Sequence, residues 1–202
     1  GLNSLFSLPD GYEVVLGNGG STAFWDIATF GLIHERSQHL VFGEFSSKFA
    51  QAAKENPFIE DPTVIKAEPG SHPVAVAETG VDVYALTHNE TSTGMTSNIA
   101  AVRKAIDDAK HPALLMVDSV SGLGSADFRH DEWGVDVTVA GSQKGLMLPP
   151  GIGFNALSPK AIEQSKRSQF PKAYLAWDEI LESNKNGYWP TTPSTNLMYG
   201  LH

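Results

Sequence analysis

The chain has 202 residues, 41% of them hydrophobic and 18% charged, a size and composition that predict one globular domain with a buried core. A formal net charge of −9 argues against nucleic acids and anionic membranes as partners. The absence of cysteine excludes a disulfide framework and a thiolate metal site, and the seven histidines show no zinc-like spacing.

The sequence shows no targeting segment. It begins with glycine, and no charged stretch precedes an apolar one as in a secretory leader. No apolar run is long enough to span a bilayer. We therefore expect a soluble, cytoplasmic protein that has no membrane partner.

Short apolar runs alternate with segments of helical periodicity along the chain. The strands predicted from the apolar runs are 13–16, 39–42, 63–67, 81–86, 113–117, 135–140 and 153–157. The helices predicted from the periodic segments are 22–33, 45–54, 97–110, 159–169 and 173–184. Such alternation predicts an α/β fold of three layers, α, β and α, with a mainly parallel mixed sheet between helices. Residues 55–62 and 68–79 read as surface loops.

The helix predicted at 97–110 has the clearest boundaries. Ser97 is a candidate cap at its start, and Pro112 is a candidate stop after its end. The apolar residues of this segment, Ile99, Val102 and Ile106, recur on one face. We expect this helix to cover the sheet and to have no role in chemistry.

Two polar side chains follow predicted strands and suggest a site. The strand at 135–140 leads into a turn that presents Lys144, and the strand at 113–117 is followed by Asp118. Carboxyl ends of parallel strands face the ligand crevice, where a desolvated lysine amine can form a Schiff base with a carbonyl. Pyridoxal phosphate needs such a pair, because its aldehyde reacts with an amine and its ring nitrogen is kept charged by a carboxylate. The purely structural interpretation is that Asp118 caps a turn and Lys144 is a solvated loop residue.

The order of three motifs resembles the signature of class V aminotransferases, which are fold-type I enzymes that use pyridoxal phosphate. The motifs are His88–Gly94, Val117–Ser119 and Gly141–Lys144. Residues 95–202 are similar to serine–glyoxylate aminotransferases, and residues 5–84 resemble phosphoserine aminotransferases of the actinobacterial type. Either the chain is a branch between the two groups or two related genes have been joined. Because whole enzymes of these families are longer, residues 1–202 are expected to be a truncated large, cofactor-binding domain without the small domain.

A glycine-rich turn, Gly17–Thr22, lies between the first strand and the first helix. Glycines allow close approach to a phosphate, and a helix start favours an anion, although such a sequence is equally typical of an ordinary turn. The resemblance implies that Gly20, Ser21 and Thr22 bind the cofactor phosphate. It further implies that Gln143 reaches a phosphate or hydroxyl group of the cofactor.

The resemblance also assigns residues to the cofactor ring. Phe45 corresponds to the aromatic side chain that stacks on the pyridine. Without the resemblance, the general tendency of aromatic residues to be buried would place Phe45 in the core. Thr91 corresponds to the hydroxyl that bonds the 3-hydroxyl group. Glu90 and Asn89 are expected to brace their loop, and His88 reads equally well as a buried structural histidine.

Three further roles follow from the resemblance. Asp118 is the expected partner of the ring nitrogen, and Lys144 is the expected attachment point and the base that moves the substrate proton. Thr192, with Thr191 as a weaker match, is expected to contact the cofactor phosphate of the neighbouring subunit. A homodimer with a shared active site is therefore predicted, although Pro190–Pro193 also reads as a rigid turn.

The predicted function is transfer of an amino group from a small amino acid, serine or alanine, to a 2-oxo acid such as glyoxylate. The alternative is a phosphoserine aminotransferase of serine biosynthesis, which uses 3-phosphohydroxypyruvate and glutamate. A lyase or decarboxylase on the same cofactor and a noncatalytic folded fragment also fit the sequence, whereas the absence of cysteine argues against cysteine desulfurases. The arginine that binds the substrate carboxylate in these families has no counterpart here, since the candidates read as surface residues: Arg36, Arg103, Arg129 and Arg167.

Overall fold

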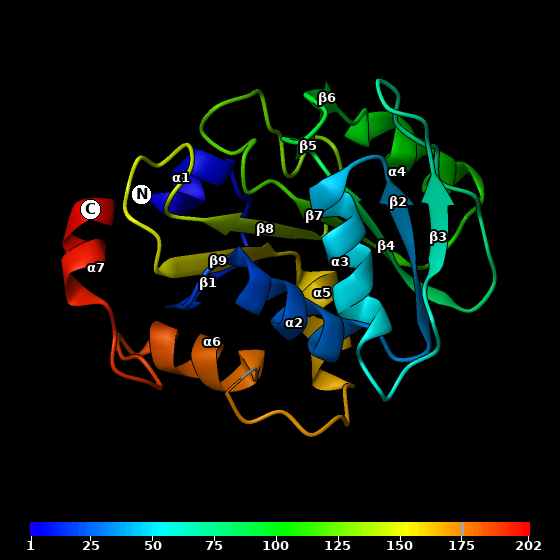
Figure 1. The fold of residues 1–202 in the computed structure, drawn as a ribbon. Helices are drawn as coiled ribbons and strands as arrows, with labels where there is room; N and C mark the ends of the chain where they lie inside the picture. Colours follow the sequence, from blue (N-terminus) through cyan, green and yellow to red (C-terminus); the bar gives the residue numbers. More distant parts are fainter. Residues whose placement is uncertain (175) are drawn as a thin grey trace.

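The computed structural model describes residues 1–174 and 176–202, and its centre is a seven-stranded sheet (Figure 1). The strand order is β1-β9-β8-β7-β4-β2-β3. The strands are β1 (Glu13–Asn18), β2 (Arg36–Val41), β3 (Thr63–Lys66), β4 (Val81–Thr87), β7 (Leu114–Asp118), β8 (Val137–Gly141) and β9 (Ile152–Leu157). Strands from β8 to β3 pair in parallel, and β9 runs antiparallel to both of its neighbours. The predicted mainly parallel, mixed sheet is confirmed.

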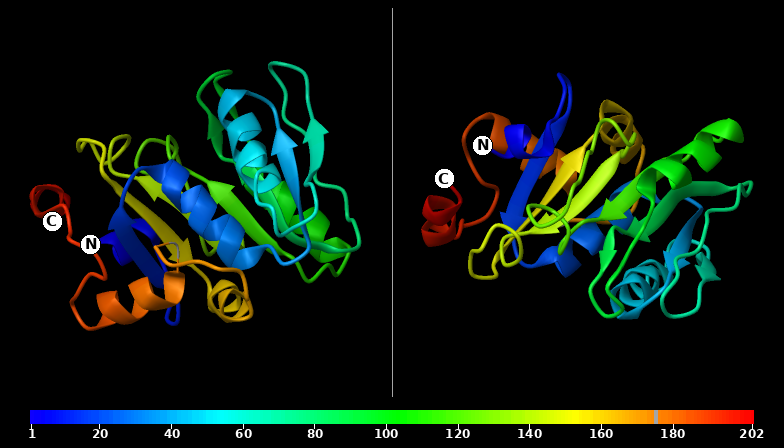
Figure 2. Two further views of the ribbon diagram at one scale, coloured as in Figure 1. Left: turned by 60° about the horizontal axis from the view of Figure 1, so that its bottom comes forward. Right: turned by 90° about the horizontal axis from the view of Figure 1, so that it is seen from above.

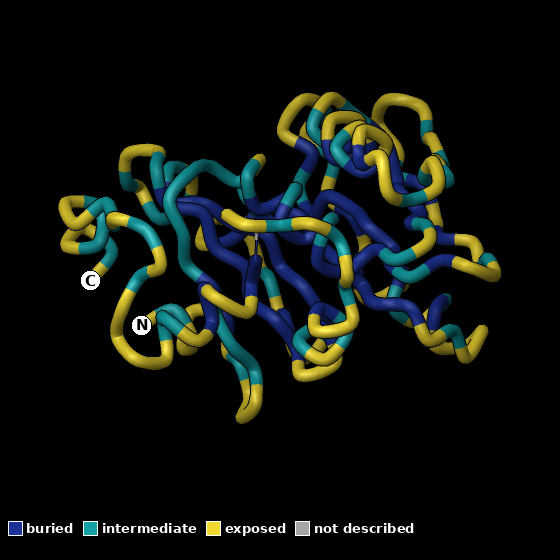
Figure 3. The backbone as a smooth tube through the Cα atoms, turned by 90° about the horizontal axis from the view of Figure 1, so that it is seen from below, coloured by how far each residue is buried: buried dark blue, intermediate teal, exposed yellow. Residues whose placement is uncertain are grey.

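Both faces of the central strands are buried, which explains their continuous apolar sequences. In β4, Val83 and Ala85 face one hydrophobic cluster, and Tyr84 and Leu86 face another. The same alternation in β7 sends Leu114 and Leu115 to opposite faces, because successive strand residues point to opposite sides. Figure 3 shows the buried strands in dark blue inside a rim of exposed turns.

Helices cover both faces of the sheet and complete three layers (Figure 2). One face is covered by α2 (Ser21–Leu32), α3 (Glu44–Lys54), α5 (Pro159–Lys166) and α6 (Trp177–Lys185). The opposite face carries α4 (Ile99–Asp108) over β4 and β7. The short helices α1 (Leu2–Phe6) and α7 (Thr195–Leu201) lie on this second face near β8 and β9. None of the described helices combines the length and the apolar composition that crossing a membrane requires.

Several elements differ from the prediction. The α4 cap is Asn98, whose side chain accepts a hydrogen bond from Ala101 N, whereas Ser97 is buried and donates to the carbonyl of Thr87. Since Ser97 is occupied by this long-range bond, the capping prediction was wrong by one residue. The helix ends at Asp108, well before Pro112.

The short elements were not predicted, because two to seven residues carry too little periodicity. They are α1, α7 and the hairpin of β5 (Asn89–Glu90) and β6 (Met95–Thr96). The helix predicted from residue 173 begins at Trp177, and residue 175 lies outside the described residues. The loops predicted at 55–62 and 68–79 contain neither helix nor strand.

Candidate functional site

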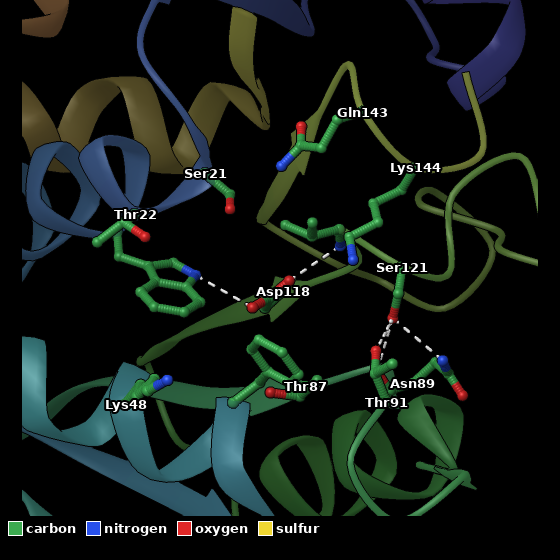
Figure 4. Close-up of a pocket in the computed structure, with 13 residues that line it drawn as sticks. Ser21, Thr22, Lys48, Thr87, Asn89, Thr91, Asp118, Ser121, Gln143 and Lys144 are labelled. Atoms are coloured by element: carbon green, nitrogen blue, oxygen red, sulfur yellow. Dashed lines mark hydrogen bonds between the residues drawn. The ribbon is translucent and has the colours of Figure 1, made fainter. Parts of the chain in front are cut away.

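A cavity of about 280 Å³ opens at the carboxyl ends of β4, β7 and β8, against the starts of α2 and α3 (Figure 4). This volume is near the lower end of the range for small-molecule sites. Seven of the nine predicted site residues line it: Ser21, Thr22, Phe45, Thr91, Asp118, Gln143 and Lys144. Gly20 and Thr192 are not part of the lining.

Asp118 forms the floor of the cavity at the end of β7, with 3% of its surface exposed. One carboxylate oxygen, Oδ1, accepts a hydrogen bond from Val120 N at 2.9 Å, and Oδ2 accepts one from Trp25 Nε1 at 3.1 Å. Burial raises the pKa of Asp118 to about 6, and these two hydrogen bonds oppose the rise. The bond from Val120 N makes Asp118 a turn cap, as the structural interpretation predicted, whereas its role toward a cofactor ring stays a prediction.

Lys144 follows β8 in the turn that also carries Gln143, and Figure 4 shows its side chain extending into the cavity. Strand β8 is buried throughout, as the sequence pattern predicted. Lys144 is nevertheless an exposed residue in the part of the chain that the structure describes. The expected desolvation of its amine is therefore not present in this chain alone.

The start of α2 forms a polar wall of the cavity. Its N-terminal cap is Gly20, which offers no side chain to the free amides of the first turn, and Ser21 and Thr22 add hydroxyl groups. Gly19, just before this helix, has a φ of +114°, a backbone conformation that residues other than glycine rarely adopt. Across the cavity, Gln143 Oε1 is buried and has no hydrogen-bond partner among the described residues. The free amides and hydroxyls at the start of α2 are donors of the kind that suit an anion, and binding of the cofactor phosphate there stays a prediction.

Phe45 lines the cavity from the first turn of α3, and Glu90 holds this turn in place. The carboxylate of Glu90 accepts hydrogen bonds from Ser46 N at 2.8 Å, from Phe45 N at 3.3 Å and from Ser92 Oγ at 2.7 Å. Burial raises the pKa of Glu90, but the hydrogen bonds from Ser46, Ser92 and Phe45 outweigh it and leave the pKa below its usual value. The predicted bracing role of Glu90 is consistent with these contacts.

Thr91 lies in a small network of hydroxyl and amide groups. Its hydroxyl and the amide nitrogen of Asn89 each lie 3.0 Å from Ser121 Oγ, which in turn donates to the carbonyl of Asn89. Figure 4 shows these groups gathered beside Asp118. Ser121 therefore fixes the position of Thr91.

His88 is a structural residue. It is 1% exposed, its Nδ1 lies 3.2 Å from Ser119 Oγ, and it packs against Phe128 and Trp133 outside the cavity lining. Burial lowers the pKa of His88. The interpretation of His88 as a buried histidine with a satisfied nitrogen is confirmed.

None of the four arginines considered from the sequence lines the cavity. Arg129 and Arg167 are exposed, as expected. Arg36 is partly buried and forms a 3.0 Å ion pair with Glu78. Arg103 is also partly buried, with 15% of its side chain exposed, and it forms ion pairs with Asp107 and Asp136. Its aliphatic part lies against Gly134, which leaves no space for a side chain there.

Thr192 lies in the segment between α6 and α7, next to the glycine-rich turn. Its carbonyl accepts a hydrogen bond from Asn18 Nδ2, and Ser194 N donates to Asn18 Oδ1 at 3.1 Å. The side chain of Asn18 thus ties this segment to the end of β1. The contact of Thr192 with a neighbouring subunit stays a prediction.

Sequence reasoning missed several side chains that line the cavity or hold its residues. Trp25 lies one helical turn after Ser21, and Lys48 lies one turn after Phe45. Because residues three or four positions apart share a helix face, this spacing could have predicted that both side chains line the cavity. The ammonium of Lys48 is 2.9 Å from a Glu44 oxygen and 5.7 Å from the Phe45 ring centroid. Residues without such a signal are Thr87, Val120 and Ser121.

Comparison with known proteins gives consistent matches. A model of the family described as aminotransferase class-V matches residues 72–186. A phosphoserine aminotransferase from a Nocardioides species is 54% identical over 167 residues, which are 82% of this chain and 43% of that protein. This match is much longer than residues 5–84, so the similarity to phosphoserine aminotransferases extends well into the carboxyl-terminal part.

Solved structures show the same fold. A phosphoserine aminotransferase from Cytophaga hutchinsonii has a TM-score of 0.88 and 27% identity, over 99% of this chain and 56% of that chain. An aspartate aminotransferase of subgroup IV from Thermus thermophilus has a TM-score of 0.81 and 30% identity, over 99% of this chain and 57% of that chain. The chain spans less than half the length of the Nocardioides protein.

Proposed function

Because the chain belongs to the class V aminotransferase family, we propose that residues 1–202 form the pyridoxal phosphate-binding large domain of a transaminase. The observation that supports this most is the convergence of Asp118 and Lys144. The two residues come from different strand ends, and both line the same cavity (Figure 4). A buried acid and an accessible amine in one cavity are the pair that this cofactor requires.

The residues present fit the cofactor. The uncapped start of α2 and the hydroxyls of Ser21 and Thr22 provide donors for a phosphate. The unpartnered Oε1 of Gln143 is a buried acceptor that a bound group can satisfy. Asp118 provides the only carboxylate in the described lining, and Phe45 provides a flat apolar wall. The donors, the acid and the aromatic side chain thus line one cavity.

When bound, pyridoxal phosphate supplies an electron sink that weakens the bonds at the α-carbon of an attached amino compound. In our proposal, Lys144 attaches the cofactor covalently and afterwards moves the proton at the α-carbon. Asp118, in its ionised form, holds the proton on the ring nitrogen. Thr91, positioned by Ser121, bonds the 3-hydroxyl group, and Phe45 stacks on the ring and sets its plane.

Phosphoserine is the amino compound that we propose. The expectation of serine or alanine with glyoxylate rested on residues 95–202, but the relative with 54% identity is named phosphoserine aminotransferase and its match extends beyond residue 84. Phosphoserine is thus better supported than serine or alanine. A shared dimeric site and a cytoplasmic location stay predictions.

Covalent attachment tests the cofactor assignment. The chain is incubated with pyridoxal phosphate and reduced with borohydride, and the modified peptide is identified by mass spectrometry. We expect the label on Lys144 and its complete loss in Lys144→Ala. Lys48→Ala is the matched control, because Lys48 is the second lysine that lines the cavity, and it should keep the label. A label that persists in Lys144→Ala would refute the assignment.

Amino-group transfer then tests the substrate. Phosphoserine with 2-oxoglutarate is compared with serine and glyoxylate, with the product measured in the presence and absence of the 2-oxo acid. We expect turnover of phosphoserine that depends on the 2-oxo acid. Repeated turnover without any 2-oxo acid, beyond one equivalent of product per bound cofactor, would indicate a lyase, and a chain that takes up no cofactor would indicate a noncatalytic fragment.

A further inference from the structure

Trp25 makes a direct contact with the acid at the floor of the cavity. It lies on α2, and its indole Nε1 donates to Asp118 Oδ2 at 3.1 Å, across 93 residues of sequence (Figure 4). Only 5% of Trp25 is exposed, although one part of it lines the cavity. The cofactor-binding residues predicted from the sequence do not include this side chain.

The core fixes the orientation of the Trp25 ring. Its indole stacks on Phe49 of α3, with centroids 5.4 Å apart and an angle of 22° between the planes. Phe49 in turn meets the buried His39 edge to face at 5.1 Å. Because these rings are close-packed, the indole N–H cannot turn away from Asp118 without opening the core.

Asp118 receives one hydrogen bond on each oxygen, from Val120 N and from Trp25 Nε1. A carboxylate oxygen has two acceptor positions, so each oxygen keeps one for a ligand. We propose that Trp25 is a positioning residue that holds Asp118 with its free acceptor positions toward the cavity and favours the ionised form needed by the cofactor ring nitrogen. This inference rests on the proposed function.

Neutral donors matter here because Asp118 is surrounded by few compensating charges. Burial raises the pKa of Asp118, and the negative charge of Glu90 raises it further. The hydrogen bonds from Val120 and Trp25 and the positive charge of Lys144 lower it. Attachment of a cofactor to Lys144 would change that amine, whereas the indole N–H keeps its effect in every state of the site.

The first test needs no variant. In the cofactor-free chain, the indole N–H resonance of Trp25 is followed by NMR as the pH is raised from 4 to 8. Trp177 is the internal control, because its buried indole donates to the uncharged Asn155 at 3.2 Å. We expect the Trp25 resonance to shift with a midpoint near 6, the pKa of Asp118, and the Trp177 resonance to stay constant. A Trp25 resonance that does not titrate would overturn the proposal.

The second test removes the donor. Trp25→Phe keeps an aromatic ring against Phe49 but lacks the N–H, and Trp177→Phe is the matched control. One hydrogen bond to a carboxylate lowers its pKa by about one unit. Trp25→Phe should therefore raise the pKa of Asp118 by roughly one unit, measured by NMR of the carboxyl carbon. Trp177→Phe should leave the pKa of Asp118 unchanged. An unchanged value in Trp25→Phe would contradict the proposed coupling.

A double-mutant cycle connects this coupling to cofactor binding. Trp25→Phe should weaken binding of pyridoxal phosphate about tenfold in the parent and much less in an Asp118→Asn background. Equal losses in both backgrounds would show that Trp25 acts on the cavity shape and not through Asp118. If the parent takes up no cofactor, the proposed function fails, while the two cofactor-free titrations still decide whether Trp25 controls Asp118.

Discussion

Asp118 illustrates at the scale of one residue how a functional group opposes folding. Its ordinary pKa of 3.8 rises to about 6 in the folded chain, mainly because it is buried. Between these values the unfolded chain releases the proton first, so the folded state loses stability as the pH rises from about 4 to about 6. Above about pH 6 the folded state carries the full loss of stability that comes from burying the ionised Asp118. The difference in pKa corresponds to up to about 3 kcal/mol of unfolding free energy.

Replacement of Asp118 tests this penalty. Asp118→Asn removes the titration, so its unfolding free energy relative to the parent should increase by up to about 3 kcal/mol between pH 4 and pH 7. The measurement is urea denaturation of the cofactor-free chains at a series of pH values. Curves for parent and variant that stay parallel over this range would show that Asp118 is not perturbed. The same replacement should weaken cofactor binding, so stability and function change in opposite directions.

At the scale of elements, α3 depends on a residue from another part of the fold. Its first amides are satisfied by Glu90, which lies only three residues after the end of β4 and belongs to the β5–β6 hairpin. A carboxylate at this end also interacts favourably with the helix dipole. Since Phe45 lies in the same turn, the hairpin positions the aromatic wall of the cavity.

Loss of this capping charge should destabilise the chain. Glu90→Gln should cost about 1–3 kcal/mol, because several hydrogen bonds to a charged acceptor become bonds to a neutral one. The pKa of Glu90 is lowered, so its stabilisation is present above its ordinary value of 4.5 and is lost as the pH falls through the lowered pKa. Denaturation of both chains at pH 7 and pH 3 measures this.

Glu44→Gln is the matched control for that experiment. Glu44 lies at the same end of α3 but is exposed, and its carboxylate pairs with Lys48 at the surface. We expect a change below about 1 kcal/mol, as for other exposed pairs. Equal effects of the two replacements would mean that Glu90 acts only through general charge at the helix start.

At the scale of the whole molecule, the fold brings distant segments to one end of the sheet. Strands β4, β7 and β8 lie side by side in parallel, so the groups that follow them meet at one edge. The antiparallel β9 returns beside them, and the loop before it holds the glycine-rich turn through a bond from Gly19 N to the carbonyl of Gly151. Asn18 then ties the segment of Thr192 to that turn.

A mixing experiment tests the predicted dimer. If Thr192 contacts the cofactor of the neighbouring subunit, a mixture of Lys144→Ala and Thr192→Ala chains should contain sites in which both residues are intact. Tight cofactor binding, lost in each variant alone, should reappear in about a quarter of the sites after random pairing. Absence of this recovery, with dimers shown by ultracentrifugation, would place Thr192 in the site of its own chain.

Local sequence patterns predicted most elements but not their details. The run at 135–140 is rich in valine and predicted the buried strand β8, which the structure places at Val137–Gly141. Ser97 and Asn98 are both good helix caps, and a bond from Ser97 to Thr87 decided between them. The β5–β6 hairpin was missed because two-residue strands have no period.

The sequence by itself determined the alternation of strands and helices and the residues that stand at the strand ends, because burial and periodicity act over neighbouring positions. Only the tertiary structure decided which of these residues meet. The contacts of Trp25 with Asp118, of Glu90 with Ser46 and of Thr91 with Ser121 join positions 93, 44 and 30 residues apart. Such hydrogen bonds depend on strand order and side-chain packing, which no local pattern records.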